Sequence, residues 1–363
     1  MTRLVKEILD RAASGHSPDR EELTALLDIR HENEYQALFQ TAYEMKKQNV
    51  GPVVYFRGLI EISNICQKDC LYCGIRKSNR KVPRFRLTID EIVEAARWAH
   101  ANQYGSLVLQ GGEIQDDTHT QFINEALRRL HAATNNELAV TLSLGEQSRD
   151  VLRLWRQSGA HRYLLRLETS RQDLYRRYHP EDHLWAPRLQ CLEDLRSEDY
   201  QVGTGVMIGL PGQTSGDLAD DLLFIHQLDV DMIGMGPFIP HSDTPLAHHL
   251  PDFDKTRQLN LGLKMLACAR LLLPDANMAA TTALQALSDT GRELGLQAGA
   301  NIVMPNVTDP KHRRAYQLYD GKPSLDENSQ QSRLGQEKRI AGIGETIGYG
   351  MWGNSPRFAR RIC

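Results

Sequence analysis

The sequence has almost no net charge and no long hydrophobic run. Its 363 residues carry 43 Lys and Arg against 46 Asp and Glu, a net charge of −3. This balance gives no sign of a nucleic-acid or membrane-surface partner, and no apolar stretch is long enough to span a bilayer. The opening stretch "MTRLVKEILDRAASG" spreads charges along a helical pattern, unlike a secretory signal. We therefore expect a cytoplasmic protein that binds neither nucleic acid nor membranes.

Cysteine is scarce, with only six residues in the chain. Thiols stay reduced in the cytoplasm, so a disulfide framework is not expected. Cys191 and Cys268 fall at apolar positions of helical patterns, which is typical of small buried residues, and Cys363 ends the chain. The other three lie within eight positions in "NICQKDCLYCGI". Such a cluster indicates metal binding or catalysis.

Short β-rich runs alternate with amphipathic stretches after a polar, helical region at 1–50. Eight such strands over about 250 residues predict an α/β fold of the (β/α)8 TIM-barrel type, with a doubly wound open sheet as the alternative. We expect an N-terminal helical extension at 1–50, the barrel at 51–322 and a C-terminal cap at 323–363. The predicted strands are 53–63, 106–110, 138–144, 162–168, 202–208, 232–236, 278–282 and 301–305.

Polar residues follow the predicted strands where each one ends. In a barrel the carboxyl ends of the strands form one mouth, where active sites are built. Turn residues and helix caps explain the glycines there, but they do not explain why several side chains with carboxylate, amide or hydroxyl groups would converge. These side chains are Gln110, Glu113, Ser143, Glu146 and Glu168.

The three clustered cysteines, Cys66, Cys70 and Cys73, follow the first predicted strand and therefore lie at the same mouth. Zinc would need a fourth ligand, and the chain has no second CxxC pair. Three thiolates suit a four-iron cluster that leaves one iron open to a ligand.

The spacing Cx3Cx2C, with Tyr72 before the last cysteine, resembles the signature of the radical S-adenosylmethionine (SAM) enzymes. The resemblance implies that the three cysteines hold one [4Fe–4S] cluster whose open iron chelates the amino and carboxylate groups of SAM. It also implies that an electron from this cluster cleaves SAM to methionine and a 5′-deoxyadenosyl radical. An electron donor such as ferredoxin or flavodoxin is then an expected partner.

Longer blocks, among them "VLQGGE", "RYLLRLETS", "GPFIPHSDTPLA", "MAATTAL" and "YQLYDGK", resemble the HydE family of [FeFe]-hydrogenase maturases. That family implies an organometallic iron–cysteine substrate and other hydrogenase maturases as partners. Methylornithine synthase and biotin synthase are looser matches, so a radical SAM mutase or sulfur-inserting enzyme acting on a small molecule is the alternative. A non-catalytic iron–sulfur carrier is a third hypothesis, and it would produce no 5′-deoxyadenosine.

The resemblance also implies roles for individual residues. Those expected to contact SAM or its surroundings are Tyr72, Gln110, Gly111, Gly112, Glu113, Ser143, Glu168, Arg188, Met232 and Pro237. Those expected to act toward the substrate are Arg162, Arg166, Thr281, Thr282 and Tyr316. Two departures from the family stand out. The stretch after "YQLY" has no cysteine for a second cluster, and Leu167 stands where histidine is common.

Overall fold

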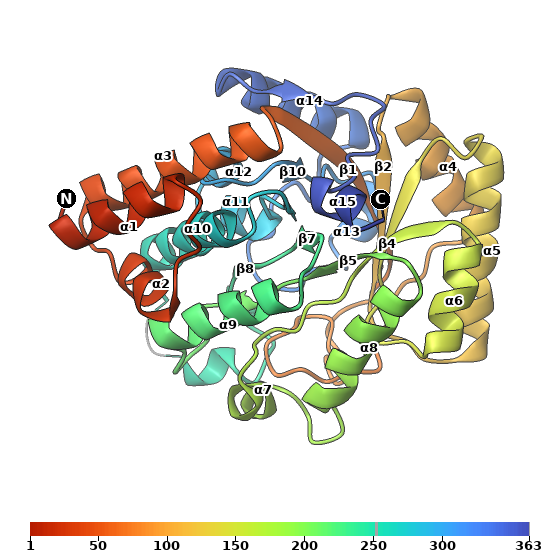
Figure 1. The fold of residues 1–363 in the computed structure, drawn as a ribbon. Helices are drawn as coiled ribbons and strands as arrows, with labels where there is room; N and C mark the ends of the chain where they lie inside the picture. Colours follow the sequence, from red (N-terminus) through yellow and green to blue (C-terminus); the bar gives the residue numbers. More distant parts are fainter. Residues whose placement is uncertain (251–252, 363) are drawn as a thin grey trace.

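Parallel strands in barrel order form the centre of the molecule (Figure 1). The computed structural model describes residues 1–250 and 253–362. Within them the sheet order is β10-β1-β2-β3-β4-β5-β7-β9. Backbone hydrogen bonds from Asn301 N to Met278 O and from Ala280 N to Ile302 O, each 2.9 Å long, join β9 to β10 and close the ring. The predicted (β/α)8 barrel is therefore confirmed. The strands are β1 (Val53–Ser63), β2 (Ser106–Gly111), β3 (Ala139–Ser143), β4 (Ala160–Leu164), β5 (Gln201–Thr204), β7 (Met232–Ile233), β9 (Asn277–Met278) and β10 (Ile302–Val303).

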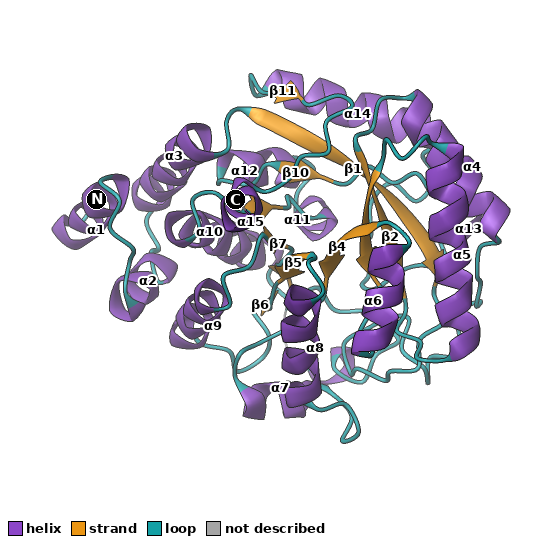
Figure 2. Ribbon diagram, turned by 45° about the vertical axis from the view of Figure 1, so that its right-hand side comes forward, coloured by secondary structure: helices purple, strands orange, loops and turns teal. Residues whose placement is uncertain are grey.

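Helices surround the strands on the outside (Figure 2). Local sequence explains where several of them begin: Thr88 and Glu91 form a capping box at the start of α4, and Thr214 and Asp217 form one at α9. The wall consists of α4 (Ile89–Ala101), α5 (Asp117–Ala133), α6 (Arg149–Gln157), α7 (Gln172–Tyr178), α8 (Trp185–Ser197), α9 (Ser215–Gln227), α10 (Lys255–Leu272), α11 (Thr282–Leu287), α12 (Gly291–Gln297) and α13 (Pro310–Arg313). Among the described residues, no helix is both long and apolar enough to cross a membrane.

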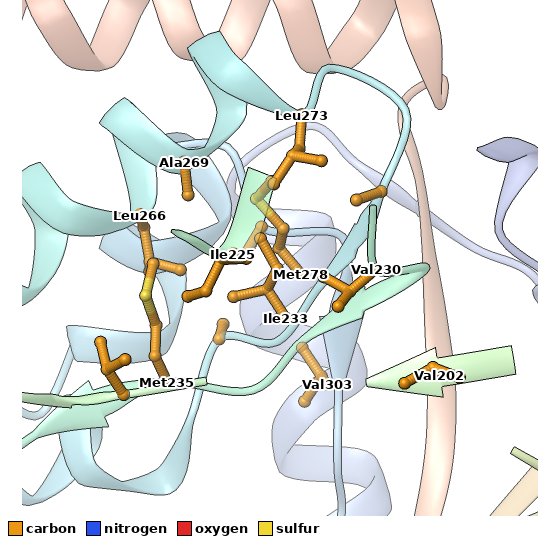
Figure 3. Close-up of a cluster of buried hydrophobic side chains, with 14 of the residues drawn as sticks. Val202, Ile225, Val230, Ile233, Met235, Leu266, Ala269, Leu273, Met278 and Val303 are labelled. Atoms are coloured by element: carbon orange, nitrogen blue, oxygen red, sulfur yellow. The ribbon is translucent and has the colours of Figure 1, made fainter. Parts of the chain in front are cut away.

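The core lies between the outer faces of the strands and the helices. Figure 3 shows one part of it, where Ile233 of β7 and Met278 of β9 face Leu266 of α10 and Ile225 of α9. These side chains are at most 2% exposed. Burial of one such side chain contributes about 1.5–3 kcal/mol, so this layer fixes the strands whose ends carry the site.

Two predicted strands are each broken near the mouth. The run at 202–208 divides into β5 and β6 (Met207–Ile208), and the run at 232–236 divides into β7 and β8 (Gly236–Pro237). A Cβ at Gly205 would clash with the carbonyl oxygen of Gly234, so only glycine allows this close backbone approach. Beyond it, β6 and β8 pair as a separate two-stranded sheet.

The chain ends pack against the barrel from outside. Three helices, α1 (Arg3–Ala13), α2 (Arg20–Leu27) and α3 (Glu32–Asn49), precede β1, and α14 (Ser329–Gly342), β11 (Thr346–Ile347) and α15 (Pro356–Ile362) follow α13. Strand β11 pairs with the start of β1. Residues 352–354 then cross the amino ends of the strands: Trp352 O accepts from Arg162 Nη2 at 2.7 Å, and Gly353 O accepts from Asn277 Nδ2 at 2.9 Å. The C-terminal segment therefore covers the floor of the barrel, opposite the mouth.

Candidate active site

A cavity of about 300 Å³ opens among the carboxyl ends of the strands. Its wall combines the cysteine loop after β1 with the ends of the neighbouring strands and the segment after α13. Of the residues predicted for the site, it is lined by Cys66, Cys70, Cys73, Tyr72, Gln110, Gly111, Gly112, Glu113, Ser143, Arg166, Glu168, Arg188, Pro237, Thr281 and Tyr316.

Backbone hydrogen bonds from distant segments hold the cysteine loop in place. Gln67 N donates to Glu113 O at 2.8 Å, Leu71 N to Tyr178 O at 3.0 Å, and Gly74 N to Leu318 O at 2.9 Å. The three cysteines are free thiols of intermediate exposure. The loop is therefore an ordered part of the mouth, with its sulfur atoms available to the cavity.

The "GGE" turn after β2 passes directly beneath this loop. A Cβ on Gly112 would collide with the carbonyl oxygen of Ile65 and with the Cβ of Cys66, so glycine is required there. The close approach brings Glu113, which is 6% exposed, to the edge of the cysteine loop.

Arg188 of α8 links two of the carboxylates at the mouth. Its Nη1 lies 2.7 Å from Glu146 Oε1 and 3.5 Å from Glu113 Oε2. Lys68 Nζ lies 3.3 Å from the other oxygen of Glu113. Burial raises the pKa of Glu146, but hydrogen bonding to His183 and the charge of Arg188 outweigh it and lower this pKa to about 2. Glu146 is therefore an ionised partner of Arg188.

Glu168 adopts a backbone conformation that is rare for a residue with a side chain. Its φ is +70°, in the left-handed region. Hydrogen bonds from its N to Gly205 O (3.1 Å) and from Met207 N to its O (2.9 Å) hold it there. Its Oε2 lies 2.9 Å from Arg166 Nη2. Residues held in such conformations cluster at functional sites, and Glu168 lines the cavity.

Comparisons with known proteins agree with this geometry. The model of the radical SAM superfamily matches residues 60–225. The [FeFe] hydrogenase maturase subunit HydE of Thermotoga maritima is 45% identical over 306 residues, which is 84% of each chain. The chain belongs to the HydE family of the radical SAM superfamily.

More distant relatives of this HydE-family protein share its barrel. Biotin synthase of Gloeothece citriformis and 3-methylornithine synthase of Methanosarcina acetivorans are each 26% identical, covering 82% and 83% of this chain and 83% and 84% of theirs. The crystal structure of methylornithine synthase has a TM-score of 0.81 at 23% identity, covering 94% of this chain and 98% of that one. A structure of the maturase HydG has a TM-score of 0.82 at 17% identity, covering 99% and 80%. These structures show the fold.

As a radical SAM enzyme, the protein uses a [4Fe–4S] cluster and SAM, and the cysteine loop fits the cluster chemically. In this structure the three sulfur atoms do not form a group whose members all lie within 4.8 Å of one another, and three thiolates are the ligands of a four-iron cluster that leaves one iron open. Burial and the neighbouring thiols raise the pKa of Cys73 to about 12, and burial raises the pKa of Cys70. Thiols in such a place become thiolates when a cationic metal compensates their charge.

Three of the predicted residues do not line this cavity in the HydE-family structure. Arg162 and Met232 lie toward the amino ends of β4 and β7, and their side chains reach the barrel floor: Arg162 contacts Trp352 O, and Met232 Sδ lies 2.9 Å from Arg57 Nη1. Thr282 is the first residue of α11, and its hydroxyl accepts from Arg292 Nη2 at 3.1 Å. The adjacent Thr281 is the one that lines the cavity.

Other residues of the mouth were not predicted to have roles. Glu146 could be placed at the mouth by its position after the third strand, but its pairing with Arg188 could not. His183 Nδ1 lies 3.7 Å from Cys70 Sγ, and its Nε2 lies 3.0 Å from Glu146 Oε1. His179 Nε2 accepts from the Tyr72 hydroxyl at 2.8 Å, because its Nδ1–H donates to Tyr175 O. Both histidines lie between α7 and α8, in a stretch with no motif.

Proposed function

We propose that this protein acts in the maturation of the [FeFe]-hydrogenase active site, as a radical SAM enzyme on an organometallic iron–cysteine precursor. The observation that carries the proposal is the convergence of the cysteine loop, the "GGE" turn and Glu168 on one cavity, in a chain 45% identical to a HydE maturase. When bound, the cluster and SAM supply the reducing electron and the 5′-deoxyadenosyl radical.

The side chains divide into two groups around the cavity. On the loop side, we assign Cys66, Cys70 and Cys73 to hold the cluster. We assign Glu113 to accept from the SAM ammonium, since its buried Oε1 makes no hydrogen bond in the described structure and has only the Lys68 ammonium, 3.3 Å away, as a salt-bridge partner. Arg188 holds the other oxygen of Glu113 and so keeps the carboxylate aimed at the cavity.

A second group of cavity-lining side chains is the one we assign to the substrate. Thr281 Oγ1 and Arg166 Nε are buried without hydrogen-bond partners in the described structure, and both residues line the cavity with Tyr316. Hydroxyl and guanidinium donors in a water-poor site favour an anionic ligand. An iron complex with thiolate or other anionic ligands has this character. The surrounding apolar residues, such as Phe238 and Ile239, would shield a radical from water.

The predicted partners and location are part of the same proposal. Other hydrogenase maturases would supply the precursor or receive the product, and a one-electron carrier would reduce the cluster. We place the protein in the cytoplasm, because free cysteines that must bind iron need reducing conditions.

The test uses Thr281→Val, with Thr282→Val as the matched control. Thr281→Val removes a hydroxyl from the cavity, whereas Thr282→Val removes one that faces Arg292. Both variants should keep the cluster and bind SAM, but only Thr281→Val should lower the activity of hydrogenase matured with it. If deleting the gene leaves hydrogenase activity intact and creates an amino-acid or cofactor auxotrophy, the maturase assignment is wrong and a radical SAM mutase or sulfur-inserting enzyme replaces it. Failure to form 5′-deoxyadenosine would instead indicate a carrier.

A further inference from the structure

A lysine of the cysteine loop, Lys68, reaches the carboxylates of the mouth. It lies between Cys66 and Cys70 in the sequence, and its Nζ is 3.3 Å from Glu113 Oε1 and 3.9 Å from Glu146 Oε2. Neither contact is a hydrogen bond, since Glu113 Oε1 has no hydrogen-bond partner in the described structure and 3.9 Å is too long for one. The Lys68 ammonium is therefore held beside these oxygens by charge, and the site described above gives it no role.

The oxygen that Lys68 approaches is the one we assign to the SAM ammonium. Both groups are ammonium cations, and two of them cannot share one carboxylate oxygen without repelling each other. The other oxygen of Glu113 faces Arg188 at 3.5 Å, so it offers no second place of the same kind. Lys68 is therefore the protein's own competitor for the ammonium-binding oxygen of Glu113.

The backbone of Lys68 is fixed, whereas its side chain can turn. Gln67 N donates to Glu113 O at 2.8 Å, and Lys77 N donates to Lys68 O at 2.9 Å. The Gln67 side chain also accepts from Gln115 N at 3.0 Å. These bonds hold the loop in place around Lys68. Its ammonium, in contrast, sits on a flexible four-carbon stem, so it can leave Glu113 without any movement of the loop.

A second cleft, of about 600 Å³, also has Lys68 in its wall. It lies among α5, α6 and α8, which are neighbours around the barrel (Figure 1). Among the described residues that line it, Lys68 is the only Lys or Arg. We call it the acidic cleft, because the carboxylates in its wall are Asp116, Asp117, Glu146, Asp182 and Asp194. The Lys68 side chain can therefore turn from Glu113 toward other carboxylates, of which Glu146 is already within 3.9 Å.

We propose that Lys68 competes with the SAM ammonium for Glu113 and so limits how tightly the site retains SAM and methionine. The inference rests on the proposed function, in which Glu113 accepts from that ammonium. Binding moves the Lys68 ammonium toward the acidic cleft, and release of the methionine formed from SAM lets it return. No covalent bond changes. The Glu113 carboxylate keeps a cation beside it throughout, which matters because a buried charge without a partner is costly.

The test measures ligand dissociation constants of the cluster-loaded protein by equilibrium dialysis. Lys68→Met removes the competing ammonium and should tighten SAM, S-adenosylhomocysteine and methionine about threefold to tenfold, because apparent affinity scales with the fraction of molecules in which Glu113 is free. 5′-Methylthioadenosine has no ammonium, so its affinity should not change. The amino-acid part of S-adenosylhomocysteine has no net charge and its sulfur is neutral, so tighter binding of this ligand reports the contact with Lys68 and not its long-range field.

Matched variants separate the contact from the loss of a charge. Lys77→Met takes the same charge from an exposed neighbour of the loop and should match the parent protein. Lys68→Arg keeps a cation and should not tighten binding. In a Glu113→Gln background, Lys68→Met should have no further effect, since a double-mutant cycle shows coupling between groups that interact. Lys68→Gln replaces Lys68→Met if that variant does not hold the cluster.

The results distinguish this inference from the proposed function. If Glu113→Gln alone leaves the affinity for SAM unchanged, the assignment of Glu113 fails, and the competition fails with it. If Glu113→Gln weakens SAM binding but Lys68→Met does not tighten it, only the competition proposal is wrong. Weaker binding in Lys68→Met would show that Lys68 binds the SAM carboxylate instead. Equal tightening of 5′-methylthioadenosine, or by Lys77→Met, would also overturn the proposal, because neither change involves an ammonium at Glu113.

Discussion

At the residue scale, three carboxylates of the mouth differ in how closely positively charged or histidine side chains of the protein approach them. Glu146 is engaged by Arg188 at 2.7 Å and His183 at 3.0 Å, and Glu168 by Arg166 at 2.9 Å. Glu113 has only longer contacts, at 3.3 Å to Lys68 and 3.5 Å to Arg188. Glu113 is therefore the carboxylate with the most capacity left for a ligand, and Glu146 is the one that orients Arg188.

This difference predicts the effect of Glu113→Gln on SAM binding. The variant keeps the shape but loses a charged acceptor, which is worth roughly 1.5–3 kcal/mol, or about ten- to a hundredfold in affinity. Equilibrium dialysis of the cluster-loaded protein measures it. The control is Glu94→Gln, whose carboxylate is exposed on α4. An unchanged affinity in Glu113→Gln would mean that Glu113 serves only to hold Lys68 and Arg188.

At the element scale, α5 carries a histidine that sits in an apolar layer of the barrel wall. His119 is 1% exposed, stacks on Phe122 and meets the edge of Trp155. Neither of its ring nitrogens has a hydrogen-bond partner in the described structure. Burial lowers the pKa of His119 from 6.5 to about 4. The folded protein therefore holds this ring neutral at pH values where the unfolded chain protonates it.

His119 should make the protein less stable in mild acid. Between pH 6.5 and 4 the unfolded state binds more protons than the folded state, so the free energy of unfolding falls as the pH falls. The loss reaches about 3 kcal/mol by pH 4. Urea unfolding across this range should show a shallower decline in His119→Phe than in the parent protein. The control is His16→Asn, which changes an exposed ring and should leave the slope of stability against pH unchanged. If His119→Phe has the same slope as the parent protein, the argument is wrong.

The strand bounds show how much of the fold could be predicted from the sequence. The run of buried residues at 53–63 gave β1 with its bounds, because a strand covered on both faces reads as a continuous apolar stretch. From β3 onward, the strands were predicted too long at their carboxyl ends. There β4 ends at Leu164, shortly before the positive φ of Glu168, and β5 ends at Thr204, just before the close backbone approach at Gly205. The residues that build the site thus end the strands early, and residue preferences alone do not show this.

Prediction of the site had a similar limit. Motifs placed the cysteine loop, "GGE" and Glu168 correctly at one cavity, since the carboxyl ends of parallel strands must meet. They could not tell which of two adjacent threonines faces it, because Thr281 precedes α11 and Thr282 begins it. They also could not show that the Arg162 side chain reaches Trp352 O at the barrel floor, because alternation along a strand indicates whether a side chain faces the inside or the outside of the barrel but not its depth along the barrel axis.

At the scale of the whole molecule, the two chain ends meet in a buried ion pair. Lys46 of α3 donates to both oxygens of Glu345, at 2.6 and 2.7 Å, and to Leu296 O at 3.2 Å. Both charged side chains are 0% exposed. The pair ties the N-terminal helices to the segment that pairs with β1 through β11 and continues across the barrel floor. Charges at this depth are stable only together.

Separating these charges should therefore destabilise the protein strongly. Glu345→Gln leaves the Lys46 ammonium buried without a counter-charge, and we expect it to lower the free energy of unfolding by about 3–5 kcal/mol. The double variant Lys46→Met, Glu345→Leu removes both charges and should recover most of the loss, because apolar side chains tolerate the same site. Glu44→Gln breaks the exposed pair with Lys47 and should cost less than about 1 kcal/mol. Urea denaturation of the four proteins measures all three differences. A loss in Glu345→Gln no larger than in Glu44→Gln would show that water reaches Lys46, and that the chain ends are held by their apolar contacts alone.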